Sequence, residues 1–322
     1  YLTSFKENYK VIIADSSEDD KKFYDIKQII LKNNFIFKSF PSKIKVAQKI
    51  SEALNLVSTK YSVLCADDDF IYPPSVKKCI NFLKNNPDYT TCHGKYYIHT
   101  SYNDSKKYGV IFRNQSMNIN SCEFEDPLER VQFYIDGKLG SQYPFYAVSE
   151  TVNLKKIWHQ TNMYANDWLI NEYFPCIISL IIGKMKSLPI FYMSREPNLN
   201  NWVNKDRINL IFKKEMNDIY SKGIVENLKM EGSAKNIDGL EDKFMNIFEL
   251  KKQNLLINKT NINSNNKKNL LKSFLKVYYY IYKKKVFEFQ NKSDLENIKK
   301  IEDLIIKTGD INSEITLSRK KY

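Results

Sequence analysis

Three consecutive aspartates, Asp67, Asp68 and Asp69, follow directly on a short apolar segment over residues 61–66. Adjacent carboxylates repel one another unless a cation neutralises them, and carboxylate oxygens are the ligands that magnesium and manganese prefer. A divalent ion held there would bridge to the phosphates of a nucleotide and help a diphosphate to leave by acting as a Lewis acid. The alternative interpretation is a solvated acidic turn, or an N-cap for the helix that opens at Pro73.

A second acidic position stands at the end of an earlier apolar run. Residues 9–15 are mostly apolar and end in Asp15, which Ser16 and Ser17 follow. An aspartate at a strand end can accept hydrogen bonds from a nucleobase or a ribose, which makes Asp15 and the neighbouring Ser17 candidate nucleotide-binding residues. The alternative is a local role, either as an Asx turn or as the N-cap of a helix that begins at Glu18.

The elements that must position these carboxylates alternate along the chain. Strands are predicted over residues 9–15, 35–40, 61–66, 90–99, 143–149 and 187–193. Helices are predicted over residues 18–34, 43–58, 73–83, 127–135, 152–160 and 166–182. This alternation with short links predicts an α/β fold with a mixed, mainly parallel sheet flanked by helices. Ligands of such sheets bind outside the carboxyl ends of strands, where both acidic positions stand.

The C-terminal part of the sequence has a different character. Strand signals fade, so we expect an α/β domain over residues 1–204 and a mostly helical C-terminal extension over residues 205–322. Residues 258–269 are polar and predict a linker or an exposed loop. The basic segment, residues 267–292, carries eight lysines and one glutamate among aromatic residues. It is predicted either to lie as a helix on an anionic membrane surface or to form a helical subdomain with a solvated lysine face.

The bulk properties narrow the class of protein. A net charge of +13 over 322 residues favours an anionic partner, and no recognised nucleic-acid motif accompanies it. The five cysteines include no CxxC pair, so we expect a reducing compartment rather than a zinc site or a disulfide framework. No apolar run is long enough to span a bilayer and no signal peptide is visible. The prediction is a cytoplasmic protein, or one that the basic segment holds at the inner face of the plasma membrane.

One known family has these motifs in the same order. A strand ends in Asp15-Ser16-Ser17, two helix–strand units follow, and a further strand leads into Ala66-Asp-Asp-Asp-Phe-Ile-Tyr-Pro73. Later come Gly183-Lys184, the apolar residues 188–192 and Arg195-Glu196. This order resembles the family-two glycosyltransferases of the GT-A fold, and it is most similar to a bacterial subgroup with an Ala-Asp-Asp-Asp-Phe motif. The chain begins at Tyr1 almost inside a strand, so we expect the first strand of that fold to be missing from this sequence.

The resemblance implies donor-binding roles for the matching residues. Asp15 would contact the nucleobase or the ribose. Asp67 and Asp69 would form the Asp-x-Asp pair that holds metal and diphosphate, with Asp69 as the direct metal ligand. Asp68 would also contact the donor, because the register among the three aspartates is open by one position. Arg195 would pair with the donor phosphates, or else form a surface salt bridge.

The catalytic base is less sharply implied. In the family it lies in a Glu-Asp motif at a helix N-terminus, whereas Asn166 replaces the glutamate here. Asp167 matches the remaining position of the motif, and Glu172 follows five positions later. Both stay candidates for the carboxylate that takes the proton of the acceptor hydroxyl. The alternatives without a catalytic role are an N-cap for Asp167 and a helix-surface charge for Glu172.

The implied activity is an inverting, metal-dependent transfer of a sugar from a nucleotide-sugar donor to an acceptor hydroxyl. The implied cofactor is manganese or magnesium, and the implied acceptor is a glycan or lipid-linked glycan of a bacterial surface polysaccharide. Three alternatives stay open. A nucleotidyltransferase that forms nucleotide-sugars would need a Gly-rich, Arg-containing loop that is not visible. A binding module for carbohydrate or a partner that has lost activity is compatible with the absent Glu-Asp pair, and a nucleic-acid-binding protein fits the charge alone.

Overall fold

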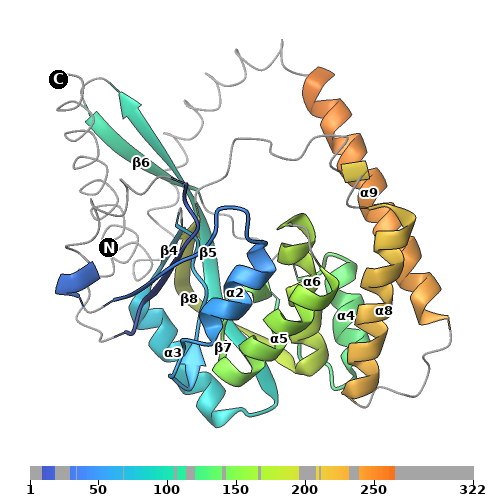
Figure 1. Cartoon of the computed structure of the whole chain (residues 1–322), viewed down its shortest axis with the longest axis horizontal. Helices are drawn as coiled ribbons and strands as arrows, with labels where there is room; N and C mark the ends of the chain where they lie inside the picture. The colour runs from blue at the N-terminus through green and yellow to red at the C-terminus, as the bar shows by residue number, and fades with distance from the viewer. Residues whose placement is uncertain are drawn as a thin grey trace.

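The elements of the molecule follow one another in nearly the predicted order. The computed structural model describes residues 9–18, 30–33, 35–67, 69–104, 107–113, 120–139, 143–165, 168–195, 208–209, 212–231 and 239–264. The basic segment and most of the helix predicted over residues 18–34 lie outside them, so both stay predictions. The fold class is confirmed as α/β, with a mixed sheet between layers of helices (Figure 1).

The bounds of the elements are as follows. The strands are β1 (Ile12–Asp15), β2 (Ile36–Ser39), β3 (Tyr61–Ser62), β4 (Asp69–Ile71), β5 (Tyr89–Asp104), β6 (Lys107–Arg113), β7 (Val148–Glu150) and β8 (Lys184–Arg195). The helices are α2 (Val46–Leu54), α3 (Pro73–Asn85), α4 (Pro127–Ile135), α5 (Thr151–Tyr164), α6 (Trp168–Ile182), α8 (Lys214–Met230) and α9 (Leu240–Ser264), with a 3-10 helix η2 (Tyr143–Tyr146).

The main sheet has the strand order β3-β7-β5-β8-β4, and β6 pairs with the outer part of β5 as a hairpin. β5 and β8 are parallel, whereas β3–β7, β7–β5, β8–β4 and β5–β6 are antiparallel. β1 and β2 form a separate parallel pair. Antiparallel pairing is therefore more frequent among the described strands than the alternation indicated. The reason is that β4 and β7 are strands of three residues each that enter the sheet from turns, and the alternation pattern does not encode such insertions.

The strand predicted over residues 61–66 is shorter in the structure. It ends at Ser62, and the chain then turns, with the amide of Asp69 donating to the carbonyl of Ala66 at 3.3 Å. The sequence predicts that Asp69 follows the carboxyl end of a strand. In the structure, Asp69 is instead the first residue of β4. In β4 the side chains of Asp69 and Ile71 are buried on one face. The alternation of buried and less buried side chains along the strand therefore begins at Asp69.

A second correction concerns the strand predicted over residues 143–149. The structure has the 3-10 turn η2 there, and a strand only from Val148. Pro144 explains the difference, because proline has no N–H to donate to a sheet ladder and favours a turn. The amide of Ala147 instead donates to the carbonyl of Pro144 at 3.3 Å.

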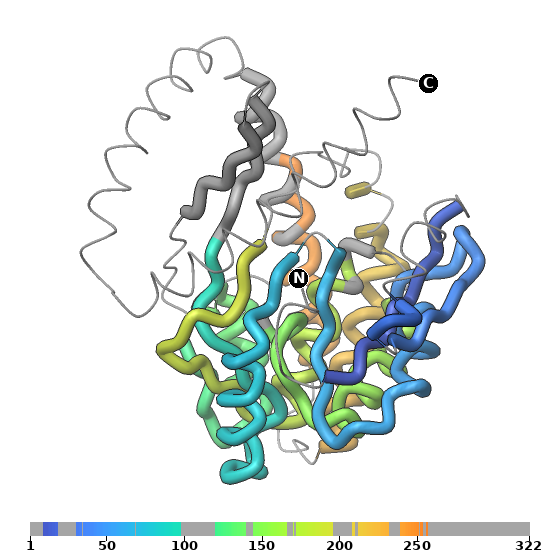
Figure 2. Tube along the Cα trace, turned by 90° about the vertical axis from the view of Figure 1, so that its left-hand side faces the viewer, coloured from blue at the N-terminus to red at the C-terminus, as the bar shows by residue number. Residues whose placement is uncertain are grey.

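Helices cover both faces of the sheet. α3 packs against β5, β7 and β8, and in Figure 2 it stands in front of the strands while α5 and α6 lie behind them. On the α3 side, a smaller core gathers Ile71, Val76, Cys79, Leu83, Cys92, Tyr96, Tyr146, Val148, Tyr192 and Met193. These side chains fix β4 and β8 beside α3, and the candidate site lies at the end of those two strands.

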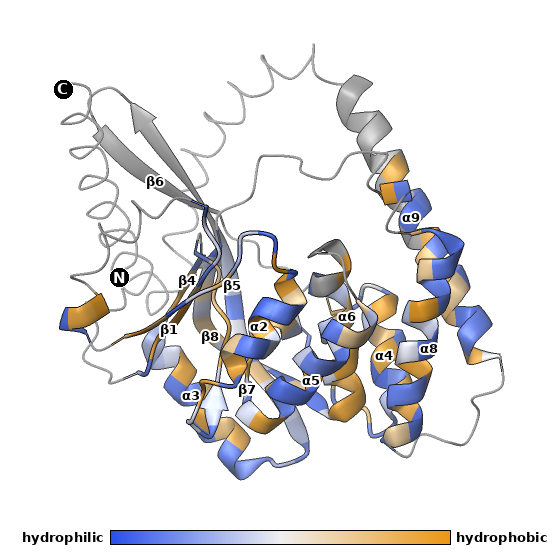
Figure 3. Cartoon of the chain, viewed as in Figure 1, coloured by the Kyte–Doolittle hydropathy of each residue, from blue (hydrophilic) through white to orange (hydrophobic). Residues whose placement is uncertain are grey.

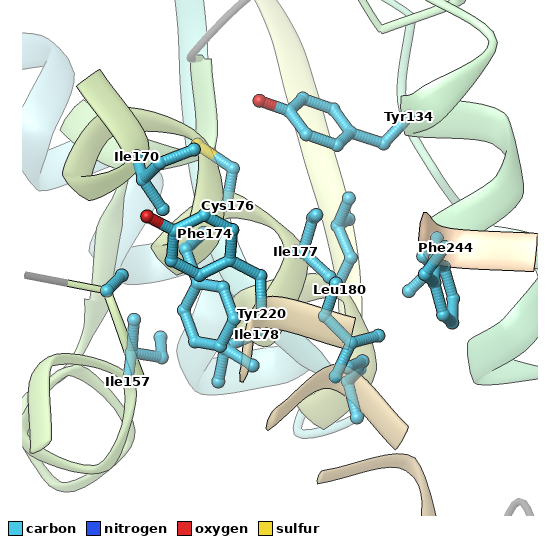
Figure 4. Packing of buried hydrophobic residues seen from close by; sticks show 14 of the residues in the cluster. Tyr134, Ile157, Ile170, Phe174, Cys176, Ile177, Ile178, Leu180, Tyr220 and Phe244 are labelled. Atoms are coloured by element: carbon cyan, nitrogen blue, oxygen red, sulfur yellow. The ribbon is translucent and has the colours of Figure 1, made fainter. Parts of the chain in front are cut away.

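The larger core lies on the other side and is centred on α6 (Figure 4). Phe174, Cys176, Ile177 and Leu180 of this helix are fully buried. Hydrophobic colour gathers where α4, α5 and α6 face one another (Figure 3). A helix that is apolar on nearly all sides must be enclosed by other elements, and α2, α4, α5 and α8 enclose α6.

The C-terminal helices join this larger core. Tyr220 of α8 and Phe244 and Phe248 of α9 are buried in the same cluster as α6. α9 runs to Ser264, so the prediction of a loop over residues 258–269 is wrong for its first residues. Extending a formed helix is far easier than nucleating one, and polar composition alone did not end it. In the described part of the chain, no helix is both long and apolar enough to cross a membrane.

Candidate active site

Asp69 and Arg195 face each other across the β4–β8 pair. They are register partners in the antiparallel ladder, and Nε of Arg195 donates to Oδ2 of Asp69 at 3.2 Å. The Asp69 side chain is 1% exposed, whereas the Arg195 side chain is 30% exposed. The ion pair therefore has one end in the interior and the other at the surface.

Tyr146 lies against the guanidinium of Arg195. The centroid of its ring is 4.6 Å from Cζ of Arg195, a cation–π contact of the kind that holds an arginine in one orientation. The hydroxyl of Tyr192 donates to the carbonyl of Tyr146 at 2.6 Å and anchors the η2 turn to β8. The backbone of Tyr146 is thus held by β8, the same strand that carries Arg195.

Glu172 of α6 contributes charge to the same place. Burial disfavours the charged form of Arg195, but Tyr146, Asp69 and Glu172 together hold its pKa above the ordinary value. Glu172 is half-buried, and its charge also acts on Cys176 one turn further along α6. We call Asp69, Arg195, Tyr146 and Glu172 the arginine cluster.

The beginning of α3 keeps β4 in register with β8. The amide of Tyr72 donates to the carbonyl of Tyr192 at 2.8 Å, and the hydroxyl of Ser75 donates to the carbonyl of Phe191. Pro73 opens the helix at its first position, where a missing N–H costs nothing. The turn after β4 therefore locks Asp69 opposite Arg195.

The other predicted donor-binding residues that the structure describes lie outside the arginine cluster. Asp67 is exposed in the turn before β4, and Asp68 lies outside the described residues. At the end of β1, the hydroxyl of Ser17 donates to Oδ1 of Asp15 at 2.7 Å and its amide donates to the same oxygen at 3.3 Å. This is the Asx turn that was the local alternative for these two residues. Their role in nucleotide binding stays a prediction, because an Asx turn can also present its outer carboxylate oxygen to a ligand.

Of the two candidate bases, only Glu172 can be placed. Asp167 lies outside the described residues, whereas Glu172 is half-buried on α6 and its charge acts to raise the pKa of Arg195. Tyr146 is the member of the cluster that sequence reasoning missed. The apolar pattern predicts a strand for its segment, and Pro144 is the signal in the sequence that favours a turn instead.

The arrangement of the carboxylates bears on the divalent ion that the sequence predicts. Among the described residues, no three His, Cys, Asp or Glu side chains are grouped so as to hold a metal. Asp69, the implied direct ligand, has Arg195 at 3.2 Å. A dication about 4 Å from a guanidinium is repelled by about 8 kcal/mol at an effective dielectric constant of about 20. The carboxylate of Asp69, as it lies here, does not fit a divalent ion.

Three comparisons with known proteins gave one set of similar structures. No family model matches the chain, and no curated protein matches it. Among solved structures, a 1–349 fragment of S. aureus TarS is 12% identical with a TM-score of 0.43, over 72% of this chain and 65% of that chain. Longer TarS is 13% identical with a TM-score of 0.41, over 68% of this chain and 38% of that one. The 1–349 fragment in complex with UDP is 14% identical with a TM-score of 0.42, over 74% and 68%.

The first of these matches covers less than two thirds of the TarS fragment, since its share is 65%. At such identities and TM-scores the likeness says nothing about the residues of a site or about a substrate. The chemistry of this chain must be inferred from its own residues.

Proposed function

We propose that this protein is a glycosyltransferase that moves a sugar from a nucleoside-diphosphate sugar to an acceptor hydroxyl. The observation that carries the proposal is the arginine cluster. It places a fixed, partly exposed guanidinium beside carboxylates at one edge of an α/β sheet, next to the acidic turn of Asp67. A guanidinium suits the diphosphate of such a donor, because its N–H groups match phosphate oxygens in pairs.

The chemistry also needs an acceptor hydroxyl and a carboxylate base. The acceptor oxygen attacks the anomeric carbon, the bond between that carbon and the diphosphate oxygen breaks, and the diphosphate leaves with the bonding electrons. A carboxylate takes the proton of the acceptor hydroxyl. Glu172 or Asp167 would fill this role, and the attack from the side opposite the leaving group would invert the anomeric configuration.

The remaining donor contacts follow the sequence predictions. Asp15 would bind the nucleobase or the ribose with Ser17 beside it, Asp67 would lie at the diphosphate, and Asp68 would also contact the donor. The proposed acceptor is a glycan or lipid-linked glycan of a bacterial surface polysaccharide, a proposal that rests on the resemblance of the sequence motifs. The basic segment, residues 267–292, would bring the enzyme to an anionic membrane where such acceptors are assembled.

The test measures both binding and product. Thermal shifts are recorded with UDP-, GDP-, CDP- and dTDP-sugars, with and without manganese, for the wild type and for Asp69→Ala. Turnover of the stabilising donor is then followed by the nucleotide that is released. Free nucleoside diphosphate supports glycosyl transfer, whereas pyrophosphate released in a separate assay with a nucleoside triphosphate and a sugar 1-phosphate would point to a nucleotidyltransferase. A donor that binds without any turnover would identify the chain as a binding module that has lost activity.

A further inference from the structure

One side of the Arg195 guanidinium contacts other residues of the protein, and the other side is available to a ligand. Nε donates to Asp69, and Tyr146 covers one face of the plane. Among the described residues, neither Nη group donates a hydrogen bond, and the side chain is 30% exposed. The two Nη groups are thus the part of Arg195 that can contact a ligand, while the hydrogen bond from Nε to Asp69 orients the guanidinium.

The carboxylates around Arg195 give this cation an unusual amount of support. Asp69 is buried at 1% exposure and in contact with it, and Glu172 acts on it from α6. Asp69 forms an ion pair with the guanidinium of Arg195. The sequence predicts that the same carboxylate holds a divalent metal ion. A metal ligand and an arginine partner make opposite demands on one carboxylate, because a dication and a guanidinium repel each other.

We propose that Arg195, held by Asp69 and Tyr146, provides the positive charge that stabilises the leaving diphosphate, so that donor binding and transfer do not require a divalent metal. This inference rests on the proposed glycosyl transfer and specifies its electrostatics. In that step the bond between the anomeric carbon and the diphosphate oxygen breaks, and the bonding electrons pass to this oxygen. The Nη groups of Arg195 donate hydrogen bonds to the diphosphate as its charge grows, and no proton leaves the guanidinium.

Asp69 and Tyr146 are positioning residues in this scheme. Asp69 fixes the long side chain from inside the sheet, and the ring of Tyr146 restricts rotation of the guanidinium plane. A preoriented arginine loses little conformational freedom when a diphosphate binds, which is the physical benefit of a buried partner.

The test titrates UDP, GDP, CDP and dTDP separately into the wild type by calorimetry, once in EDTA and once with manganese. We expect one of them to bind in EDTA with a Kd within about threefold of its Kd in manganese. The Arg195→Lys variant should bind it about tenfold more weakly in EDTA, because an ammonium cannot pair with two phosphate oxygens as a guanidinium does. Turnover of the matching sugar donor in EDTA should fall in the same variant.

Lys186→Gln is the matched control. Lys186 lies on the same strand with 29% of its side chain exposed, against 30% for Arg195, and it pairs with Glu123 away from the cluster. It should bind the nucleotide as the wild type does. Arg195→Lys keeps a positive charge beside Asp69, and its thermal unfolding is recorded to verify the fold. If this variant does not fold, the wild-type comparison between EDTA and manganese still decides whether a divalent metal is required, and a requirement for manganese overturns the proposal.

The outcomes separate this inference from the function beneath it. Binding or turnover that requires manganese, or Arg195→Lys binding like the wild type in EDTA, overturns the role of Arg195 and leaves glycosyl transfer standing. If none of the four nucleotides binds in either buffer, both the inference and the proposed function fail.

Discussion

At the scale of single residues, the two candidate bases can be separated by experiment. Glu172 belongs to the arginine cluster through its effect on the pKa of Arg195, whereas Asp167 lies outside the described residues. We expect Glu172→Gln to lower turnover by about 100-fold or more, the usual effect of removing a general base. Donor affinity should change little, because glutamine keeps the size of the side chain. Steady-state kinetics and calorimetry measure the two effects.

Glu215→Gln serves as the comparison for that substitution, since Glu215 is exposed in the first turn of α8, an element distinct from the cluster. It should leave turnover unchanged. Unchanged turnover in Glu172→Gln itself would assign the base to Asp167, and Asp167→Asn would then be the inactive variant.

His93 makes folding sensitive to acid. It is fully buried in β5, where burial lowers its pKa to about 4, although its contact with the Gly94 carbonyl at 2.8 Å acts in the opposite direction. In the unfolded chain the imidazole of His93 takes up a proton near pH 6.5, whereas in the folded chain it stays neutral at that pH. The free energy of unfolding should therefore fall by up to about 3 kcal/mol as the pH drops from about 6.5 to about 4.

Urea unfolding of the wild type and of His93→Gln, at about pH 7 and about pH 5, measures this contribution. The variant is less stable at the higher pH, because a buried ring is lost, but its stability should depend less on pH. An equal pH dependence in the two proteins would show that His93 takes up its proton without unfolding.

At the scale of elements, a buried arginine joins α4 to the end of α6. Arg130 is 4% exposed, and its guanidinium donates to the carbonyls of Leu180 at 2.6 Å and Ile181 at 3.0 Å. It also donates to the carbonyls of Phe124 and Glu125, both at 2.8 Å. The last carbonyls of a helix have no partner within the helix, so this side chain acts as the C-cap of α6.

Replacing Arg130 should therefore be costly. We expect Arg130→Met to lower the free energy of unfolding by about 3 kcal/mol or more, because four buried or partly buried carbonyls lose a charged donor. Arg130→Lys keeps the charge but cannot reach all of these carbonyls, so its loss should be smaller. Urea denaturation measures both, and a cost below about 1 kcal/mol for methionine would contradict the capping role.

At the scale of the whole molecule, the larger core crosses the domain boundary predicted at residue 204. Phe248 of α9 is 1% exposed, and its ring lies 5.4 Å from that of Tyr220 and 6.4 Å from that of Tyr173, which belongs to α6. Elements that share one core unfold together, so we expect the described part of the chain to unfold in a single transition.

Phe248→Ala tests this cooperativity. It should lower the free energy of unfolding by about 3–5 kcal/mol and move the whole transition, as cavities in a shared core do. Leu250→Ala, at a side chain 58% exposed on the same helix, should cost far less. Urea unfolding followed by near- and far-ultraviolet circular dichroism measures both variants. Two separate transitions, of which only one moves, would show that the C-terminal helices form an independent unit.

Much of the secondary structure was predictable because its causes are local. The apolar spacing over residues 127–135 predicted α4 to the residue, and the prolines at 73 and 74 marked the start of α3. The acidic residues were found by the same logic, because like charges in sequence stand out without any knowledge of the fold. Where local signals were weak or mixed, as at Pro144 and in residues 258–264, the predictions were wrong.

By itself, the sequence determined the fold class, the order of the elements and the residue types available for chemistry. Only the tertiary structure decided how those residues combine. Asp69 and Arg195 are 126 positions apart, and their pairing depends on β4 entering the sheet antiparallel to β8. Strand register is a long-range property, set by the packing of α3 and the η2 turn rather than by neighbours in the chain. For that reason a carboxylate that the sequence assigned to a metal lies against an arginine in the folded protein.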